Sequence, residues 1–421
     1  MSLVRHPPRT RRGLEPVAAV VAFCACLRSL RLELRMDFDV VIVGAGLVGA
    51  SFAMALRGAG LKLALVEAQA PAAVADDWDS RIYAISPGSA VFLQSIGVWK
   101  RLDRDRIAAV HEMHIYGDAA DAQLRFSAYE AGVAELAAIV ESRRLQSALW
   151  QGLEHQHDLE LICPERCTAL QLREDAAELT LAGGGTLNAK LVVAADGMHS
   201  WVRQAAGIAA EVNAYGQMGV VANFACARPH HNTAFQWFRA DGVLAYLPLP
   251  GQRMSVVWST PDAHSAELLG LPADALCARV AEAGKGALGE LSLLSPALRF
   301  PLARLRAARL SAPRIALIGD AGHVVHPLAG QGVNLGFGDA RVLARVLMQR
   351  EQFRDPGEFR LLRRYERARA EDILALAWVT DGLQRLFAAP GRAAAKLRNA
   401  GLNLTNALPV VKNLLIRRAL G

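Results

Sequence analysis

Residues 38–49 of the chain are Phe38-Asp39-Val40-Val41-Ile42-Val43-Gly44-Ala45-Gly46-Leu47-Val48-Gly49, an apolar, β-branched run that ends on three spaced glycines. A helical stretch, residues 50–60, follows. In this arrangement the first glycine permits a tight turn, the second lets the backbone approach a diphosphate, and the third lets the helix pack closely on the strand. The next strand candidate ends on Glu67, where a carboxylate can accept ribose hydroxyls. Gly44, Gly46, Gly49 and Glu67 therefore predict a dinucleotide site, which by itself fits NAD as well as FAD.

Composition shows that the chain can bury a large core. Of its 421 residues 52% are hydrophobic and 21% are charged, which excludes intrinsic disorder. This length predicts two or three domains, or one composite core with an inserted sheet. Six cysteines are too few for a disulfide scaffold of this size, so we expect reduced thiols and a cytoplasmic location. No metal-binding pattern accompanies them.

Charge is concentrated near the N-terminus. The net charge is +7, and residues 1–35 carry +5 of it through seven arginines and two glutamates. The nearly neutral remainder argues against a nucleic-acid partner, because phosphate binding needs a basic face. The apolar run at residues 17–27 is too short to span a bilayer. We interpret residues 1–35 as a disordered extension or the product of an over-extended start codon, with a targeting segment as the alternative.

Two later segments repeat the pattern of an apolar strand that stops at a polar turn. They are residues 191–197, ending Asp196-Gly197, and residues 314–320, ending Gly319-Asp320. Continuous apolar runs are typical of parallel strands that are buried on both faces. The fold class we predict is α/β, with a doubly wound Rossmann-type domain.

The middle of the chain has a different character. Short strand candidates separated by Gly, Pro and Asn fill residues 211–310, and they predict an inserted, mostly antiparallel sheet that forms one wall of a pocket. Helical patterns follow at residues 337–350 and 359–387. The sequence predicts five parts in chain order: 1–35, the N-terminal extension; 36–210, the first part of the dinucleotide-binding domain, with substrate-domain strands near 110–130; 211–310, the substrate sheet; 311–390, the last part of the dinucleotide-binding domain; and 391–421, a basic amphipathic segment.

The third turn carries the most chemistry. Asp320 follows a buried strand, where its carboxylate can accept a hydrogen bond from a ribityl or ribose hydroxyl, although an Asp after a strand is often only the N-cap of a helix. The glycine loop Gly330-Gln331-Gly332 precedes a helix and has little side-chain bulk. Its backbone N–H groups and the positive end of the helix dipole can meet an anionic edge, such as the pyrimidine of a reduced flavin.

Taken together, these motifs resemble the group A flavoprotein aromatic monooxygenases, and within them the ubiquinone-biosynthesis ring hydroxylases. The resemblance covers nearly the whole chain from Asp37 onward. It rests on residues 44–49 with Glu67, on Ala195-Asp196-Gly197-Met198-His199-Ser200-Trp201-Val202-Arg203, and on residues 319–336; shorter matches at residues 79–86, 140–145, 215–217 and 247–258 favour the quinone branch.

The resemblance implies site roles at matching positions. Asp196 with Gly197 would serve both FAD and the nicotinamide donor, and Asp320 would contact the ribityl chain. Arg81 and Arg143 would lie beside the flavin, unless they are ordinary surface or salt-bridging residues. The remaining residues with an implied role in cofactor binding are Gly319, Gly330, Gln331, Gly332 and Asn334. His326 and Pro327 are candidates for shaping the pocket of the aromatic ring, with a packed His and a turn-forming Pro as the alternative.

The same resemblance implies a reaction. An FAD-dependent monooxygenase of this kind hydroxylates an aromatic ring through a flavin C4a-hydroperoxide, with O2 as co-substrate and transient NAD(P)H or another electron donor as reductant. The implied substrate is a polyprenylated phenol of ubiquinone biosynthesis. The alternatives are a hydroxylase of a soluble aromatic compound, or a flavoprotein component of a quinone-making complex without its own turnover.

The last segment suggests a partner. Residues 391–421 hold six positive charges and no acid, interleaved with leucines and valines. A basic amphipathic segment can lie on an anionic membrane surface, so we expect a peripheral position on the inner membrane face, a contact with subunits of a biosynthetic complex, or a helix packed on the flavin domain.

Overall fold

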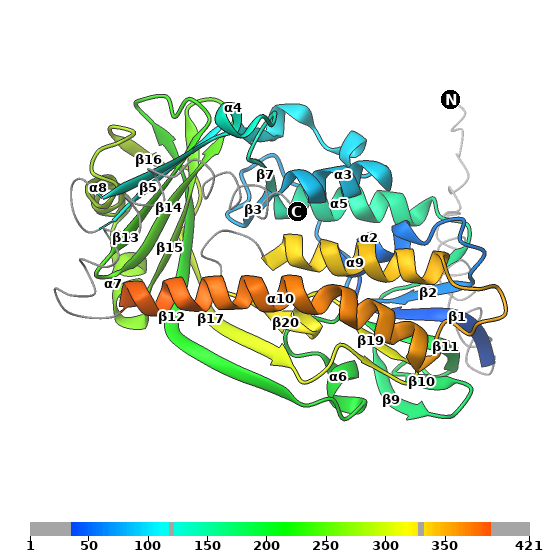
Figure 1. The fold of residues 1–421 in the computed structure, drawn as a ribbon. Helices are drawn as coiled ribbons and strands as arrows, with labels where there is room; N and C mark the ends of the chain where they lie inside the picture. The colour runs from blue at the N-terminus through cyan, green and yellow to red at the C-terminus, as the bar shows by residue number, and fades with distance from the viewer. Residues whose placement is uncertain (1–34, 118–121, 327–331, 389–421) are drawn as a thin grey trace, which may run out of the picture.

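The computed structural model describes residues 35–117, 122–326 and 332–388. In these ranges the chain forms three sheets and the helices around them (Figure 1). The predicted α/β class is confirmed. Residues 1–34 and 389–421, including the basic C-terminal segment, lie outside the described residues.

The first sheet has a parallel centre of order β19-β11-β1-β2-β8. Antiparallel strands extend it: β18 pairs with β19, and β9 and β10 join beside β11. Its strands are β1 (Arg35–Val43), β2 (Leu63–Val66), β8 (Leu159–Ile162), β9 (Cys167–Leu172), β10 (Ala177–Leu181), β11 (Thr186–Ala194), β18 (Ser311–Ala312) and β19 (Ile315–Leu317). The motifs of the sequence analysis thus end three adjacent central strands, β1, β11 and β19, at one edge.

Strand β1 begins earlier than its apolar run. The structure starts it at Arg35 rather than Phe38, because β11 extends far enough to pair Arg35 with Thr186 and Asp37 with Asn188. Asn188 also donates a side-chain hydrogen bond to Asp37, 2.8 Å away. Polar residues are therefore held in the strand by pairing rather than by burial.

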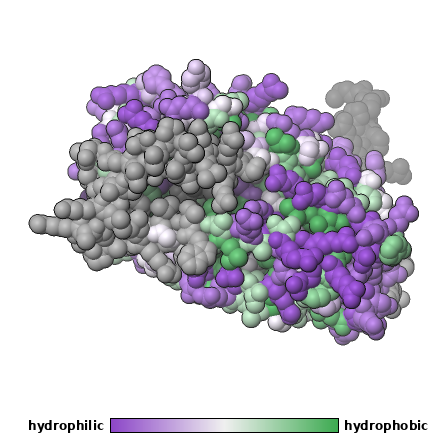
Figure 2. Space-filling view, viewed as in Figure 1, coloured by the Kyte–Doolittle hydropathy of each residue, from purple (hydrophilic) through white to green (hydrophobic). Residues whose placement is uncertain are grey.

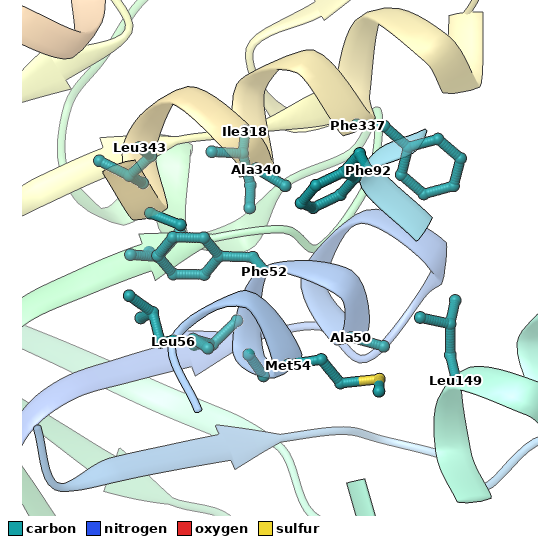
Figure 3. Close-up of a cluster of buried hydrophobic side chains, with 14 of the residues drawn as sticks. Ala50, Phe52, Met54, Leu56, Phe92, Leu149, Ile318, Phe337, Ala340 and Leu343 are labelled. Carbon is teal, nitrogen blue, oxygen red and sulfur yellow. The ribbon is translucent and has the colours of Figure 1, made fainter. Parts of the chain in front are cut away.

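Alternate side chains of β1 face two different cores. Val40 and Ile42 belong to a cluster with the helices α2 (Leu47–Ala55), α5 (Ser142–Glu154), α9 (Gly332–Met348) and α10 (Phe359–Ala388). Val41 and Val43 belong to a second cluster on the other face, with residues of β10 and the short helix α6 (Trp201–Ala205). Figure 3 shows how side chains of α2, α9 and α3 (Pro87–Ser95) meet in the first cluster. Burial on both faces explains why the central strands are continuous apolar runs.

The second large sheet is mostly antiparallel. Its order is β20-β17-β12-β15-β14-β13-β5-β6, with β16 beside β12 and one parallel pair, β13 with β5. The strands are β5 (Glu112–Tyr116), β6 (Gln123–Ser127), β12 (Ala210–Cys226), β13 (Thr233–Arg239), β14 (Gly242–Leu249), β15 (Arg253–Pro261), β16 (Leu291–Leu293), β17 (Leu298–Ala307) and β20 (His323–Val324). Because β20 follows β19 of the first sheet directly, the two sheets are joined next to the third turn.

Smaller elements complete the described chain. A three-stranded sheet contains β3 (Ile82–Ile85), β7 (Ala137–Glu141) and β4 (Ala108–Val110). The remaining helices are α4 (Ala128–Ala131), α7 (Asp262–Gly270) and α8 (Ala273–Ala283), with short 3-10 turns η2 (Trp99–Arg101), η3 (Arg104–Arg106) and η4 (Gly319–Ala321). Elements of the two large sheets alternate along the chain, and the domain boundaries at residues 36, 211, 311 and 391 stay predictions.

Helix α9 starts five residues before the predicted Phe337, inside the glycine-rich segment. Gly336 lies within this helix although glycine has a low helix propensity, because the packing at this position has no room for a side chain. A Cβ at Gly336 would lie 2.5 Å from a methyl group of Val48 and 3.4 Å from Gly319, so only glycine lets α9 lie this close to α2. Close packing of Leu335 and Phe337 into the core offsets the low helix propensity of glycine.

The described surface has no large hydrophobic area on the face drawn in Figure 2. On the described part of the face in Figure 2, hydrophilic residues predominate and hydrophobic ones form small patches. Among the described residues, no helix combines the length and the apolar character needed to cross a membrane.

Candidate functional site

The first turn fits a diphosphate. Gly44 has a φ of +102°, and a Cβ there would overlap the carbonyl oxygen of Ala195. A Cβ at Gly49 would overlap the carbonyl oxygen of Gly44, so the helix can lie this close only because both positions are glycine. Gly46 is the N-cap of α2, and no atom lies within 4 Å of a Cβ built on it. The backbone at the positive end of α2 is thus open to an anionic ligand.

Glu67 supports this turn from the end of β2. One oxygen of its carboxylate accepts the backbone N–H of Ala45 at 2.6 Å, and the other accepts that of Gln69 at 3.1 Å. The carbonyl oxygen of Ala45 accepts from Gln146 and Trp150 of α5, at 2.6 and 3.1 Å. Glu67 therefore orients the glycine loop, a role that the sequence did not predict, and its contact with ribose hydroxyls stays a prediction.

The second turn contains an unsatisfied acid. One oxygen of Asp196 accepts the backbone N–H of Val202 at 3.0 Å, at the start of α6, whereas Oδ1 is buried without a hydrogen-bond partner in the described structure. Burial raises the pKa of Asp196, although hydrogen bonds from Ser200 and the backbone oppose the shift. The neighbouring Gly197 has a φ of +80° and open space around its α-carbon. A hydroxyl group of a ligand could donate the hydrogen bond that this oxygen lacks.

The third turn lies beside the first. Gly319, with a φ of +60°, is in contact with Val48 of α2, and the following Asp320 lies within η4. The N-cap of η4 is Ile318, so the interpretation of Asp320 as a helix cap does not hold. Asp320 is exposed, yet the protein around it excludes enough water to raise its pKa, while His323 and Arg81 act in the opposite direction. It is an accessible carboxylate in a desolvated position.

A buried ionic cluster holds the third turn in place. Asp339 of α9, with no exposed surface, accepts the backbone N–H of Gly319 at 2.9 Å, contacts the His323 ring at 2.6 Å and pairs with Arg369 of α10 at 2.7 Å. Burial alone would raise the pKa of Asp339, but His323 and Arg369 outweigh it and lower the pKa. Sequence reasoning missed Asp339 and Arg369. The available signal was an acid in the apolar face of α9, seven residues after Gly332.

The structure describes only the last residue of the glycine loop, Gly332. Pro327, Gly330 and Gln331 lie outside the described residues, and Gly332 opens α9. Asn334 connects this first turn of α9 to β3: its Oδ1 accepts the backbone N–H of Ser86 at 2.9 Å, and its amide donates to the Ala84 carbonyl at 2.8 Å. Asn334 thus fixes where the loop meets the helix.

The two arginines differ in their surroundings. Arg81 is exposed and lies near enough to Asp320 to lower its pKa. Arg143 pairs with Asp77 at 3.1 Å and lies 3.6 Å from Asp79, as expected for a salt-bridging residue. A flavin-side role for either arginine stays a prediction.

His326 lies between the cofactor turns and the antiparallel sheet. It is 1% exposed, its Nε2 is 3.2 Å from the amide oxygen of Gln217 on β12, and its ring packs edge-on against Tyr215, with centroids 4.7 Å apart. The segment just before the glycine loop is therefore attached to the sheet that would form the wall of a substrate pocket. Whether His326 touches an aromatic substrate stays a prediction.

These observations test whether the site fits a flavin dinucleotide. The three turns contact one another, Gly46 leaves space at a helix N-terminus, Asp196 has an unused acceptor and Asp320 presents a desolvated carboxylate. All are features that a diphosphate and several hydroxyl groups would satisfy, so the residues fit. No group of three or more His, Cys, Asp or Glu in the described part of the chain could hold a metal ion. Fold and site define a dinucleotide-binding protein with a second sheet beside the cofactor.

The chain belongs to the FAD binding domain family, whose model matches residues 37–377. It is 34% identical to ubiquinone hydroxylase UbiL of Rhodospirillum rubrum over 385 residues, which cover 91% of this chain and 89% of that protein. It is also 34% identical to 3-demethoxyubiquinol 3-hydroxylase of Escherichia coli, with 91% and 98% of the two chains covered. The human mitochondrial ubiquinone biosynthesis monooxygenase COQ6 is 33% identical, with 89% and 91% covered.

Solved structures share the fold. The p-nitrophenol 4-monooxygenase PnpA of Pseudomonas putida superposes with a TM-score of 0.74 at 18% identity, over 92% of this chain and 99% of that chain. PqsL of Pseudomonas aeruginosa, a probable FAD-dependent monooxygenase, gives a TM-score of 0.73 at 24% identity, over 88% and 100%. The family resemblance and the cofactor FAD predicted from the motifs are thereby confirmed.

Replacing Asp339 by Asn should destabilise the protein strongly. The substitution leaves Arg369 and His323 without their buried carboxylate, and such a loss costs about 3–5 kcal/mol. Because the pKa of Asp339 is lowered in the folded state, its contribution is present above the ordinary pKa of 3.8 and is lost as the pH falls through the lowered value. The difference in unfolding free energy between wild type and variant, measured by denaturant titration, should therefore shrink in acid.

Asp372→Asn is the matched control for this prediction. Asp372 also pairs with Arg369, but its side chain is 65% exposed, so its loss should cost little. An Asp339→Asn variant no less stable than this control would show that the cluster does not hold the turn.

Asp196→Asn tests the second turn. In the folded protein the raised pKa of Asp196 penalises its ionised form; this penalty is absent below pH 3.8 and grows as the pH rises through the raised value. Without FAD, the variant should therefore gain stability relative to wild type between acid and neutral pH. Added FAD should raise the Tm of wild type more than that of the variant, because a hydroxyl group of the cofactor would donate a hydrogen bond to the Asp196 carboxylate. Equal shifts would remove Asp196 from the cofactor site.

Proposed function

We propose that the protein is an FAD-dependent monooxygenase that hydroxylates the aromatic ring of a polyprenylated phenol in ubiquinone biosynthesis. The observation that carries this proposal is the match along almost the whole chain to a ubiquinone hydroxylase and a 3-demethoxyubiquinol 3-hydroxylase. The match includes the antiparallel sheet as well as the cofactor turns. The fold of p-nitrophenol 4-monooxygenase is compatible with the proposal, but at 18% identity it supports the fold alone.

We assign each of the three turns to the part of FAD that it would contact. Gly46 faces the diphosphate, Gly44 and Gly49 allow the tight turn and the close helix packing that expose it, and Glu67 lies at the adenosine ribose. Asp196 and Gly197 contact FAD and the incoming reductant. Gly319 and Asp320 hold the ribityl chain. The residues proposed around the flavin ring are Arg81, Arg143, Gly330, Gln331, Gly332 and Asn334.

When bound and reduced, FAD would activate O2, which is the source of the oxygen atom transferred to the ring. The residues of the chain would position the flavin and the substrate ring and would stabilise negative charge on the flavin. The N-terminus of α9, fixed by Asn334, directs backbone N–H groups toward the anionic edge of the flavin. His326 lies where the cofactor turns meet β12, so we assign it to the wall of the ring pocket, together with its sequence neighbour Pro327. Strand β12 and the glycine loop together would exclude water from the reacting atoms.

The proposed reaction also needs an electron donor and access to a lipid-soluble substrate. NAD(P)H, or another electron donor, reduces the flavin during a brief visit. A polyprenyl substrate places the enzyme beside a membrane, where residues 391–421 would provide a basic contact with the surface or with other subunits of a biosynthetic complex.

The reaction can be tested with purified protein reconstituted with FAD. Supplied with NAD(P)H, O2 and a short-chain prenylated phenol, it should consume O2 and release a product with one additional hydroxyl group, identified by mass spectrometry. Labelled O2 should supply the new oxygen. The same assay with an unprenylated phenol serves as the control: faster turnover of that compound would favour a hydroxylase of soluble aromatics.

Deletion of the gene tests the biological assignment. Cells without the protein should accumulate a quinone precursor that lacks one ring oxygen. An unchanged quinone profile, together with no hydroxylation of the prenylated phenol in vitro, would contradict the assignment to ubiquinone biosynthesis.

A further inference from the structure

A hollow of about 570 Å³ opens between α2, α3 and α9, away from the cofactor turns. Helices α2 and α9 both begin at the candidate FAD site, at Gly46 and Gly332, and the hollow lies at their opposite ends. Its lining is Met54, Ala55, Arg57, Phe92, Ser95, Ile96, Gly97, Arg341, Ala344, Arg345 and Met348. A ligand here would not compete with FAD for space.

The walls of the hollow are apolar. Met54 of α2 and Phe92 of α3 belong to the core cluster drawn in Figure 3, so their positions are fixed by packing. Ile96 and Met348 add aliphatic surface, and Met348 is 50% exposed although it forms part of the wall. An aliphatic chain in the hollow would cover this surface.

The polar part of the lining is cationic. It contains three arginines, Arg57, Arg341 and Arg345, and no Asp or Glu. Arg57 donates to the carbonyl oxygen of Gly152 at 2.9 Å. Within the described residues no carboxylate forms a salt bridge with Arg341 or Arg345, whereas Arg354, in the loop after α9, pairs with both Glu351 and Glu358.

The two unpaired arginines also repel each other. Arg341 and Arg345 are four residues apart on α9 and so lie on one face of the helix. Arg341 and Arg345 are exposed, yet the protein around Arg341 excludes enough water to lower its pKa, and the charges of Arg369 and Arg345 lower it further, while Asp372 opposes them. Asp372 is itself paired with Arg369. Positive charge therefore accumulates at the hollow, and an anion would relieve it.

We propose that this hollow binds an anionic amphiphile, a phosphate group carried on an aliphatic chain. The guanidinium groups of Arg341 and Arg345 match the oxygens of a phosphate, and Arg57 adds a third positive charge. Met54, Phe92, Ile96 and Met348 accept the chain. Such a group occurs both on a freely dispersed phosphorylated lipid and on a phospholipid within a bilayer, and these two sources are separated below.

The test uses FAD-loaded protein and three probes: inorganic phosphate, lysophosphatidic acid dispersed below its micelle concentration, and phosphatidylcholine vesicles with and without phosphatidic acid. Calorimetry and vesicle flotation measure binding. Arg341→Gln/Arg345→Gln removes the proposed phosphate contacts, and Arg166→Gln/Arg306→Gln is the control, which removes two exposed arginines that do not line the hollow. Met348→Glu is a second variant, which places a carboxylate three residues from Arg345.

Wild type and control should bind dispersed lysophosphatidic acid or phosphatidic acid vesicles equally well. The Arg341/Arg345 variant should bind at least about tenfold more weakly, because two charge-assisted contacts are lost, and Met348→Glu should also be weaker. Unchanged FAD content would show that the variants are folded. Binding to the dispersed probe identifies a free ligand as the source, and binding to vesicles alone identifies the bilayer.

The proposal is overturned if wild type binds neither phosphorylated lipid, or if the Arg341/Arg345 variant binds as tightly as the control. It is also overturned if inorganic phosphate binds as tightly as lysophosphatidic acid, since the apolar walls would then contribute nothing. None of these outcomes depends on hydroxylase activity.

Discussion

The structure depends on the close packing of three turns at one edge of the parallel sheet. A side chain at Gly44 or Gly49 would overlap a carbonyl oxygen, and one at Gly336 would collide with Val48. These glycines bring the ends of β1, β11 and β19 and the starts of α2 and α9 within reach of one elongated ligand. The cofactor site is thus a consequence of close packing, and its polar groups are arranged on a rigid base.

Polar contacts then fix the turns that packing brings together. Glu67 holds the first turn through Ala45, and Asp339 holds the third through Gly319. Because Arg369 of α10 pairs with Asp339, the long helix α10 helps to hold the third turn in place. His326 connects the segment after the third turn to β12 through Gln217.

Much of this arrangement could be predicted from local sequence. The continuous apolar strands and the glycine spacing identified the α/β class, and Gly44, Gly46, Asp196 and Asp320 were placed correctly at strand ends because those positions depend on a few neighbouring residues. Contacts between distant segments could not be predicted. The pairing of Asp339 with Arg369, and that of Arg143 with Asp77, join residues whose proximity only the tertiary fold creates. The early start of α9 likewise depends on its packing against α2.

The most direct test of the account is the visible absorption spectrum of the purified protein after incubation with FAD and removal of free cofactor. The account predicts a yellow protein that retains one FAD per chain, with a flavin spectrum shifted from that of free FAD by the protein surroundings. A colourless protein that retains no FAD under conditions where it is folded would contradict it.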